Sequence, residues 1–512
     1  MKIAAATAVL AAFLLAACNV VMGPLNQDEG WYLLAGLNTA SGMMPYRDYF
    51  YSQAPFLPYF YAFASPLWAP LGVLGGRIFT SLLGLLSACL CAGFAWRVSS
   101  QRRGLAALCA WLLTACCPVY SYFTVIPKTY ALASLLVSGA FFVLAGKNRF
   151  RFEICAVLLA LACGTRVSLG ILLAVVGLGL LLMRRRDGCK FAWLRFGVAG
   201  AIALCAVFCP FMFMSGNGFA FSQSVHASRG DAGLMQWLMF RAGAASRLAQ
   251  GYFMMFVLAA CALVLGGGRC LPSLRRVSPI IWLAIAGWMA AAAVHFLAPY
   301  PYDDYQTPIM PLAAVVVSVF FAAVVAESGL RHVSVTAWTL VCLAVLFMGA
   351  SPMLMNWVSV RQDRFWVVMK EKPDVLKLRE VGKWLNEHTE DGDLILTLDA
   401  YVAVEARRRV PSGLEVGPFS FYPELSEKEA ASANVHNMET LRRLIETTDS
   451  PYAVLSGYSF AISAPEMTRT DPGMIDELNA AIRRRYKTVE IIPDFGQQHT
   501  TLEILELTKP GM

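Results

Sequence analysis

Charged residues are scarce in this 512-residue chain. They make up 15% of the sequence, whereas soluble globular domains carry about 25%. Hydrophobic residues reach 57%, above the roughly 45–50% of soluble domains, and the mean hydropathy is +0.55. This composition excludes a protein that is soluble throughout, and it indicates a chain that keeps most of its mass in a lipid bilayer.

Cysteine is absent from residues 343–512. All fourteen cysteines lie between Cys18 and Cys342. The last part of the chain therefore contains no disulfide. The cysteines of the first part lie mostly within apolar runs, where cysteine behaves as a small hydrophobic residue. Even the adjacent Cys116 and Cys117 lack the spacing of a metal site. We expect no metal ion bound by cysteine.

The sequence also lacks internal repeats and a glycine-rich phosphate loop. Secondary transporters are commonly built from repeated halves, so this absence argues against a transporter or lipid flippase, which stays the first alternative. Acids such as Asp399 and Glu405 occur near the C-terminal end, but no nucleotide fingerprint accompanies them there. We therefore expect catalysis to lie outside this last part of the chain.

Apolar stretches of about the length needed to cross a bilayer fill the first part of the chain. A transmembrane helix needs roughly 20 predominantly apolar residues. The stretch 152–183 counts as two segments because Arg166 divides it, and counting it as one would reverse every later orientation. We predict a transmembrane domain over 1–355, with eleven segments at 3–22, 76–96, 105–119, 128–146, 152–166, 167–183, 193–214, 252–267, 279–298, 308–326 and 333–354.

Lysine and arginine gather in alternate connections between these segments. Such connections face the cytoplasm in most membrane proteins. The N-terminus is then cytoplasmic, while loop 23–75 and the region after residue 355 lie on the periplasmic side of a bacterial inner membrane. The basic clusters are Arg97, Arg102 and Arg103; Lys147, Arg149 and Arg151; Arg184, Arg185, Arg186 and Lys190; Arg269, Arg275 and Arg276; and Arg331.

The first segment has a second interpretation. Its residues Leu15-Ala16-Ala17-Cys18 match the cleavage box of bacterial lipoproteins. However, the apolar run continues to Met22 and ends at Gly23-Pro24, so it is long enough to span a bilayer. We favour a transmembrane helix that happens to contain Cys18.

Residues 356–512 predict a small extracytoplasmic α/β domain. Helical periodicity at 374–388 and 472–485 alternates with β-rich runs, which lie at 393–398, 452–456 and 487–492. Such alternation is typical of α/β layers. The predicted fold class is therefore mainly α: a polytopic membrane helix bundle with a small C-terminal α/β domain.

Loop 23–75 combines a few charged residues with many aromatic ones. Asp28 and Glu29 stand where a new helix begins, and a helix N-terminus favours an ionised carboxylate. Asn26 followed by Glu29 also fits a capping box, a structural role that an amide at residue 29 would largely preserve. Capping does not explain the aromatic residues at the membrane surface. We therefore predict that Asp28 and Glu29 are catalytic.

Three motifs of this loop resemble the C-superfamily (GT-C) of integral-membrane glycosyltransferases, in particular its protein O-mannosyltransferase and aminoarabinose transferase branch. The resemblance is specific over residues 26–80 and weak over the tail. It implies an enzyme that takes a sugar from a polyprenyl-phosphate donor on the outer face of the membrane, with Asp28 as the base. The motifs are Asp28-Glu29, Gly42-x-x-Pro45-Tyr46-Arg47-Asp48 and Gln53-Ala54-Pro55-Phe56-Leu57, and Arg77 fits the same pattern.

The chain departs from this family at two places. Relatives often have Glu-Lys-Pro-Pro where this chain has Ser52-Gln53-Ala54-Pro55, so a lysine that they use on the lipid phosphate is missing. The second outside loop, 119–128, carries no acid where some relatives have one, and offers Lys128 instead. Both departures concern the site of the donor phosphate.

The residue types fit this chemistry independently of the resemblance. A phosphate leaving group is a weak base, so it needs cations that stabilise negative charge rather than a general acid. The attacking hydroxyl needs one base, unlike the paired carboxylates of a glycosidase. Further cations on the outer side are Arg229, Arg241 and Arg247. The residues predicted to bind the substrate or the donor phosphate are Tyr46, Arg47, Asp48, Lys128 and Arg166.

The expected partners follow from this interpretation. They are a polyprenyl-phosphate sugar donor, a lipid, glycan or protein acceptor, and membrane lipids, with no nucleic acid. Asp303 and Asp304 are adjacent acids and only a weak signal for a divalent cation, so we expect no cofactor and no metal. The second alternative is a polysaccharide ligase or polymerase, which shares the polyprenyl donor and the many helices.

Overall fold

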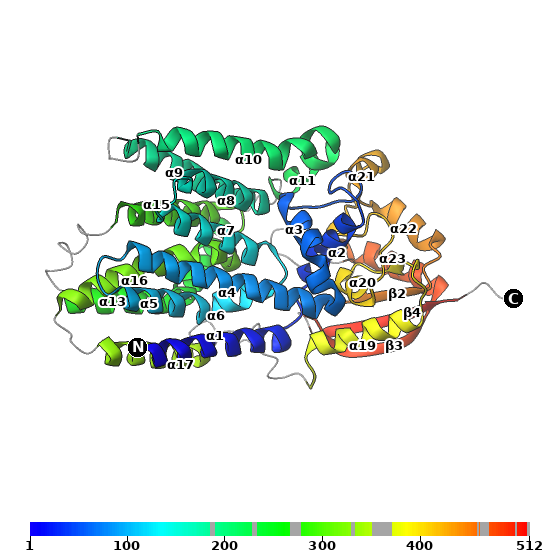
Figure 1. Cartoon of the computed structure of the whole chain (residues 1–512). Coiled ribbons are helices and arrows are strands. Elements are labelled where there is room, and N and C mark those ends of the chain that lie inside the picture. Colours follow the sequence, from blue (N-terminus) through cyan, green and yellow to red (C-terminus); the bar gives the residue numbers. More distant parts are fainter. Residues whose placement is uncertain are drawn as a thin grey trace.

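A bundle of apolar helices forms the first two thirds of the chain, and a small domain with a mixed sheet follows it (Figure 1). The computed structural model describes residues 1–184, 190–227, 233–266, 278–328, 333–350, 371–457, 460, 470–496 and 499–508. The predicted domain boundary at 355/356 and the candidate Arg229 lie outside these residues.

Each of the eleven predicted apolar stretches contains a helix. The first and the last of these helices, α1 and α17, pack against each other (Figure 1). The helices are α1 (Lys2–Met22), α4 (Gly72–Val98), α5 (Arg103–Ala115), α7 (Thr129–Leu144), α8 (Arg151–Thr165), α9 (Gly170–Leu182), α10 (Ala192–Met214), α13 (Phe253–Gly266), α15 (Pro279–Leu297), α16 (Met310–Glu327) and α17 (Val333–Ala350).

The number of crossings is a separate question from the number of helices. Among the described residues, 5 helical stretches are long and apolar enough to cross a membrane by themselves, and 2 bent pairs raise that number to 7. One pair joins α5 to α6 (Pro118–Val125) and bends by 59°, where Pro118 interrupts the helix. The other joins α12 (Leu234–Gly251) to α13 and bends by 66°. Eleven crossings stay a prediction.

The division of the stretch 152–183 at Arg166 is confirmed. Helix α8 ends at Thr165, and the backbone of Arg166 is extended, with φ −151° and ψ 110°. A short 3-10 turn, η2 (Val167–Leu169), then leads into α9. The two halves are therefore separate helices, as the predicted orientation of the later segments requires.

Loop 23–75 is not an open loop, because it folds into helices α2 (Asp28–Ala40) and α3 (Phe56–Trp68) and the turn η1 (Ala69–Leu71). In Figure 1, α2 and α3 lie between the bundle and the C-terminal domain. The aromatic residues of the loop stabilise this folded structure, since Tyr49 and Tyr51 are fully buried. Gly42 permits the turn after α2, because its φ of 93° is unfavourable for other residues.

The C-terminal domain contains a four-stranded sheet in the order β1-β2-β4-β3. Strands β1 and β2 are parallel, and β4 runs antiparallel to both β2 and β3. The predicted helices and strands of this domain are confirmed, but β4 was not predicted. The elements are α19 (Asp374–Glu387), β1 (Ile395–Leu396), α20 (Ala400–Ala406), η5 (Gly417–Ser420), α21 (Glu427–Ala433), α22 (Met438–Thr447), β2 (Tyr452–Ser456), α23 (Pro472–Arg485), β3 (Tyr486–Phe495) and β4 (Thr500–Leu507).

This domain packs directly on the helix that carries Asp28. A Cβ atom placed on Gly30 would lie 2.0 Å from the backbone nitrogen of Tyr401, so only glycine allows α2 and α20 to approach this closely. On the same side, Glu405 of α20 accepts a hydrogen bond of 2.8 Å from the backbone N–H of Val73. A carboxylate at this place also stabilises the N-terminus of α4.

Two further contacts join the domain to loop 23–75. The carboxylate of Asp374, at the start of α19, accepts a hydrogen bond of 3.4 Å from the backbone N–H of Leu25. The side-chain amide of Asn434 donates to the backbone oxygens of Tyr46 and Arg47, at 3.4 and 3.1 Å. Together with the Val73 contact, the C-terminal domain therefore holds this loop region at its start, in its middle and at its end.

Candidate functional site

Asp28 forms an ion pair with Lys128. Its Oδ2 lies 2.7 Å from the Lys128 Nζ, and the two side chains are 30% and 9% exposed. Its Oδ1 accepts a hydrogen bond of 3.2 Å from the indole N–H of Trp31. Asp28 is the first residue of α2, so the helix dipole adds to the stabilisation of its charge. The structure thus holds this carboxylate by a cation and an indole, with part of it accessible.

Lys128 lies in the short connection between α6 and α7. Pro127 precedes it, and Lys128 itself is the N-cap of α7 with an extended backbone. Tyr61 of α3 donates a hydrogen bond of 3.3 Å to its backbone oxygen. Its ammonium group lies 5.9 Å from the ring centre of Tyr130. The predicted residues Asp28 and Lys128 are therefore brought together from α2 and α7.

Arg166 also lies close to the ring of Tyr130. Its Cζ lies 5.1 Å from the ring centre of Tyr130 and 4.2 Å from that of Tyr305, distances at which a cation and an aromatic ring attract each other. The Tyr130 hydroxyl donates a hydrogen bond of 2.8 Å to Oδ2 of Asp304. Tyr305 and Asp304 belong to the 3-10 segment η4 (Asp303–Ile309). The predicted cations Lys128 and Arg166 therefore both lie within about 6 Å of the ring of Tyr130.

Tyr32 lies close enough to both Asp28 and Arg166 for their charges to affect its hydroxyl group. Burial raises the pKa of the Tyr32 hydroxyl well above its usual value, the negative charge of Asp28 raises it further, and the positive charge of Arg166 lowers it. Tyr32 follows Asp28 by one turn of α2, and its ring stacks on that of Trp31 at 3.6 Å. We call Asp28, Lys128, Tyr130, Arg166 and Asp304 the acid–cation cluster.

Glu29 points in a different direction from Asp28 and forms a buried ion pair with Arg77. Both hydrogen bonds between the two side chains measure 2.6 Å, and the side chains are 0% and 1% exposed. Arg77 also donates to the backbone oxygens of Val20, Gly23 and Pro24, where α1 ends. The pair therefore closes the last turn of α1 and anchors α2.

The expected capping contact of Glu29 is also present. Its Oε1 accepts a hydrogen bond of 2.8 Å from the backbone N–H of Asn26. The Asn26 side chain accepts one of 3.1 Å from the N–H of Asp28, two residues later. Glu29 thus has both the capping role that the sequence offered and a partner, Arg77, that sequence spacing does not reveal.

Tyr46, Arg47 and Asp48 form a separate group. Arg47 donates two hydrogen bonds to Asp48, at 2.8 and 2.7 Å, and these bonds lower the pKa of the Asp48 carboxyl. Tyr46 is buried and its hydroxyl donates to the backbone oxygen of Gln53. In the described part of the chain, no hydrogen bond or ion pair joins Arg47 or Asp48 to Asp28.

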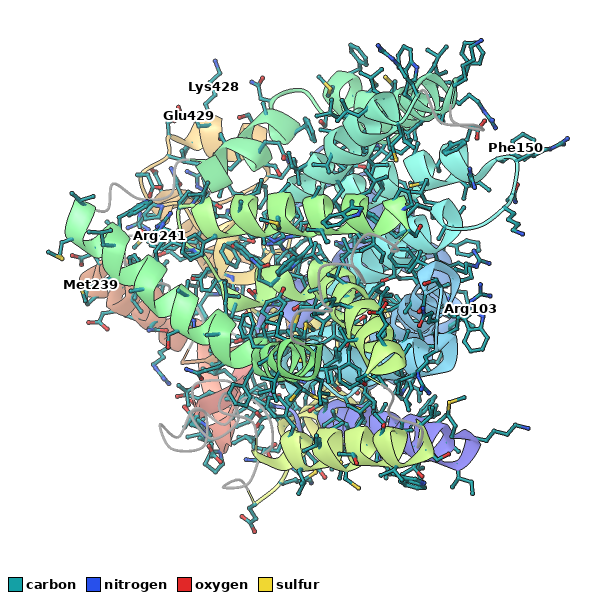
Figure 2. The ribbon with its side chains drawn as sticks, turned by 90° about the vertical axis from the view of Figure 1, so that its left-hand side faces the viewer. Arg103, Phe150, Met239, Arg241, Lys428 and Glu429 are labelled. Atoms are coloured by element: carbon teal, nitrogen blue, oxygen red, sulfur yellow. The ribbon has the colours of Figure 1, made fainter. Side chains whose placement is uncertain are left out.

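The candidates Arg241 and Arg247 bind backbone oxygens of the loop before η4. Arg241 donates to Leu297, Ala298 and Pro299, the last of which accepts at 3.2 Å. Arg247 donates to Pro301 at 3.4 Å. Figure 2 shows Arg241 next to Met239, at the edge of the molecule. These arginines thus attach α12 to the loop that leads to Asp304.

Metal ligands are not grouped in the described residues. No set of three or more His, Cys, Asp or Glu side chains has the arrangement of a metal site among them. Asp304 instead binds Tyr130 through one oxygen. Sequence reasoning did not identify Tyr130 as a site residue, although its position two residues after Lys128 was a usable signal.

Comparison with known proteins identifies the fold. No protein-family model and no curated protein matches the chain. Among solved structures, ArnT from Cupriavidus metallidurans in the apo state has a TM-score of 0.61 and 14% identity, covering 98% of this chain and 97% of that one. The same protein bound to undecaprenyl phosphate has a TM-score of 0.59 and 13% identity, with the same coverage. This chain therefore has, over nearly its whole length, the fold of ArnT.

Proposed function

We propose that this chain is a membrane glycosyltransferase that moves a sugar, a hexose or a pentose, from a polyprenyl-phosphate donor to a hydroxyl group of a lipid, glycan or protein. The observation that carries the proposal is the acid–cation cluster, in which Asp28 and two cations meet where the bundle adjoins the C-terminal domain. The ArnT structure that binds undecaprenyl phosphate supports the choice of donor.

The residues of the cluster account for each part of the reaction. The acceptor oxygen bonds to the anomeric carbon while the bond from this carbon to the phosphate oxygen breaks. Asp28 takes the proton of the acceptor hydroxyl. The electron pair of the broken bond stays on the phosphate, whose growing negative charge Lys128 and Arg166 stabilise. Water is not a reactant, so the burial of Lys128 against Tyr130 favours transfer over hydrolysis.

The other predicted residues act at a distance from this chemistry. We assign Glu29 to holding α2 through Arg77, since its carboxylate is buried in that pair. Tyr46, Arg47 and Asp48 shape the turn on which Asn434 of the C-terminal domain docks. A sugar acceptor that binds along this turn would contact Arg47, whose side chain is 46% exposed.

Removing either cation should weaken binding of the lipid phosphate. Charged hydrogen bonds are each worth about 1.5–3 kcal/mol, so Lys128→Ala and Arg166→Ala should each reduce the affinity for undecaprenyl phosphate by roughly 10- to 100-fold. Binding can be measured with the purified protein in nanodiscs. Lys383→Ala is the matched control, because Lys383 is 78% exposed on α19. Equal affinities of all three variants and the wild type would contradict the proposal.

We further propose that the protein lies in a bacterial inner membrane, with its N-terminus in the cytoplasm and its C-terminal domain in the periplasm. In Figure 2, Arg103 and Phe150 lie at one end of the molecule and Arg241 and Lys428 at the other. Arg97 of the first basic cluster lies in the last turn of α4, whereas Val73 in the first turn of this helix contacts Glu405 of the C-terminal domain. A basic residue at that far end of α4 supports the orientation under the positive-inside rule.

Labelling of single cysteines tests this orientation. In intact spheroplasts, an impermeant thiol reagent should modify Lys428→Cys, on exposed α21, and should modify Ser100→Cys only after the membrane is opened. The wild-type chain measures the background from the native cysteines. Protection of residue 428 together with labelling of residue 100 would show the opposite orientation.

A further inference from the structure

Two buried polar atoms of the acid–cation cluster have no hydrogen-bond partner in the described part of the chain. They are Oδ1 of Asp304 and Nε of Arg166. Buried polar atoms are almost always hydrogen-bonded, so two exceptions in one site call for an explanation, such as a water molecule or a ligand group. Their places in the cluster indicate which kind of group fits.

The remaining polar atoms of these side chains show how they are held. Oδ2 of Asp304 accepts the hydrogen bond from Tyr130, which leaves Oδ1 as an acceptor. The Arg166 guanidinium lies between the rings of Tyr130 and Tyr305 and donates a long hydrogen bond of 3.4 Å to Thr129, which leaves Nε as a donor. Both orientations are therefore fixed before any ligand arrives.

The unpaired acceptor is on the negatively charged Asp304 and the unpaired donor is on the positively charged Arg166. Asp304 and Arg166 both contact Tyr130, but no ion pair joins them in the described residues. A hydroxyl group can donate its hydrogen to a carboxylate while it accepts a hydrogen bond from a guanidinium. A single hydroxyl group that reached both side chains would satisfy the two buried atoms at once.

The phosphate alone does not explain Asp304. Its carboxylate repels a phosphate, and it lies at the hydroxyl of Tyr130, where a positive charge would serve phosphate binding better. A carboxylate here is instead a typical partner for hydroxyl groups, because ionised acceptors form the stronger hydrogen bonds.

We propose that Asp304 and Arg166 together bind a hydroxyl group of the sugar on the donor, so that Asp304 is a specificity-determining residue. This inference rests on the proposed function, because it places the donor phosphate at Lys128 and the sugar next to it. Nε of Arg166 then binds the sugar, while the charge of the same guanidinium still acts on the phosphate. Tyr130 is a positioning residue that orients the Asp304 carboxylate.

The test compares bare undecaprenyl phosphate with a panel of undecaprenyl-phosphate hexosides and pentosides as ligands of the purified protein. Asp304→Asn keeps the size of the side chain but leaves one oxygen, which cannot face both Tyr130 and the sugar. We expect this variant to lose roughly 10- to 100-fold in affinity for the glycoside that the wild type binds best. Its affinity for bare undecaprenyl phosphate should stay within about twofold, or increase, because a repelling charge is gone.

Two further variants make the result specific. Tyr130→Phe keeps the ring beside both cations and the Asp304 carboxylate, so it should cause a smaller loss that is again confined to the glycoside. Glu387→Gln is the control for a carboxylate-to-amide change, since Glu387 is 58% exposed on α19. Thermal unfolding of each variant verifies that it folds like the wild type.

The possible failures are distinguishable. An equal loss for the glycoside and the bare lipid in Asp304→Asn, or no loss for either, overturns the inference. So does a wild type that binds bare undecaprenyl phosphate and no glycoside more tightly, because the two buried atoms then hold only water. A wild type that binds none of these lipids contradicts the proposed function itself.

Discussion

Asp28→Asn should reduce sugar transfer by about 10²–10⁴-fold while the protein still folds and inserts, because general-base catalysis typically contributes that factor. The amide can still accept the hydrogen bond from Trp31 and can still contact Lys128, so the packing at the start of α2 is kept. The measurement is the rate of product formation with a saturating polyprenyl-phosphate donor, after equal amounts of folded protein are verified.

Two comparisons make this result specific to the base. Glu439→Gln, a carboxylate-to-amide change on a side chain that is 62% exposed on α22, should leave the rate unchanged. Binding of undecaprenyl phosphate by Asp28→Asn should be at least as tight as that of the wild type, because a negative charge next to Lys128 is removed. Turnover close to that of the wild type would show that Asp28 is not the base.

Glu29→Gln and Arg77→Met should each lower the free energy of unfolding by about 3–5 kcal/mol, because each leaves a buried charge without its partner. This differs from the expectation based on capping alone, in which an amide at residue 29 is nearly harmless. The difference arises because Arg77 is only 1% exposed and depends on the Glu29 carboxylate for neutralisation. Unfolding can be followed in mixed micelles as a function of denaturant.

The double variant Glu29→Gln/Arg77→Met provides the decisive comparison. Since it removes both charges, its loss of stability should be smaller than the sum of the two single losses, by about 0.5–3 kcal/mol. It should remain less stable than the wild type, because the backbone oxygens of Val20, Gly23 and Pro24 also lose the donors that Arg77 supplies. Strictly additive losses would mean that the two charges do not depend on each other.

The helices of the bundle were predictable because an apolar run of sufficient length has few alternatives to a helix in a bilayer. The division at Arg166 was predictable for the same reason, since a charge within an apolar run marks a place where the run is interrupted. The strand β4 was missed, although Leu502 and Ile504 alternate with the charged Glu503 in the pattern of a half-buried strand.

The contacts of the site were less predictable because they join distant parts of the chain. Residue types and their side of the membrane identified Asp28, Lys128 and Arg166 as candidates. Which cation faces the acid depends on how α2 and α7 pack, which spacing does not encode. The bond between Tyr130 and Asp304 spans 174 residues, and the bond between Arg77 and Glu29 spans 48. Asp28 and Glu29 are neighbours in sequence with different partners, because successive helical residues point in different directions.

The docking of the C-terminal domain on α2 has a consequence for the order in which the chain is synthesised. Asp28 is translated long before part of what holds its helix in place, because Gly30 of the same helix packs against Tyr401 of the C-terminal domain. The Glu405 contact bridges 332 residues and the Asp374 contact bridges 349. The helix that carries the acid therefore reaches its final position only after most of the chain has been translated and the C-terminal domain has folded against it. A nascent or prematurely terminated chain thus lacks the contacts that complete the surroundings of Asp28.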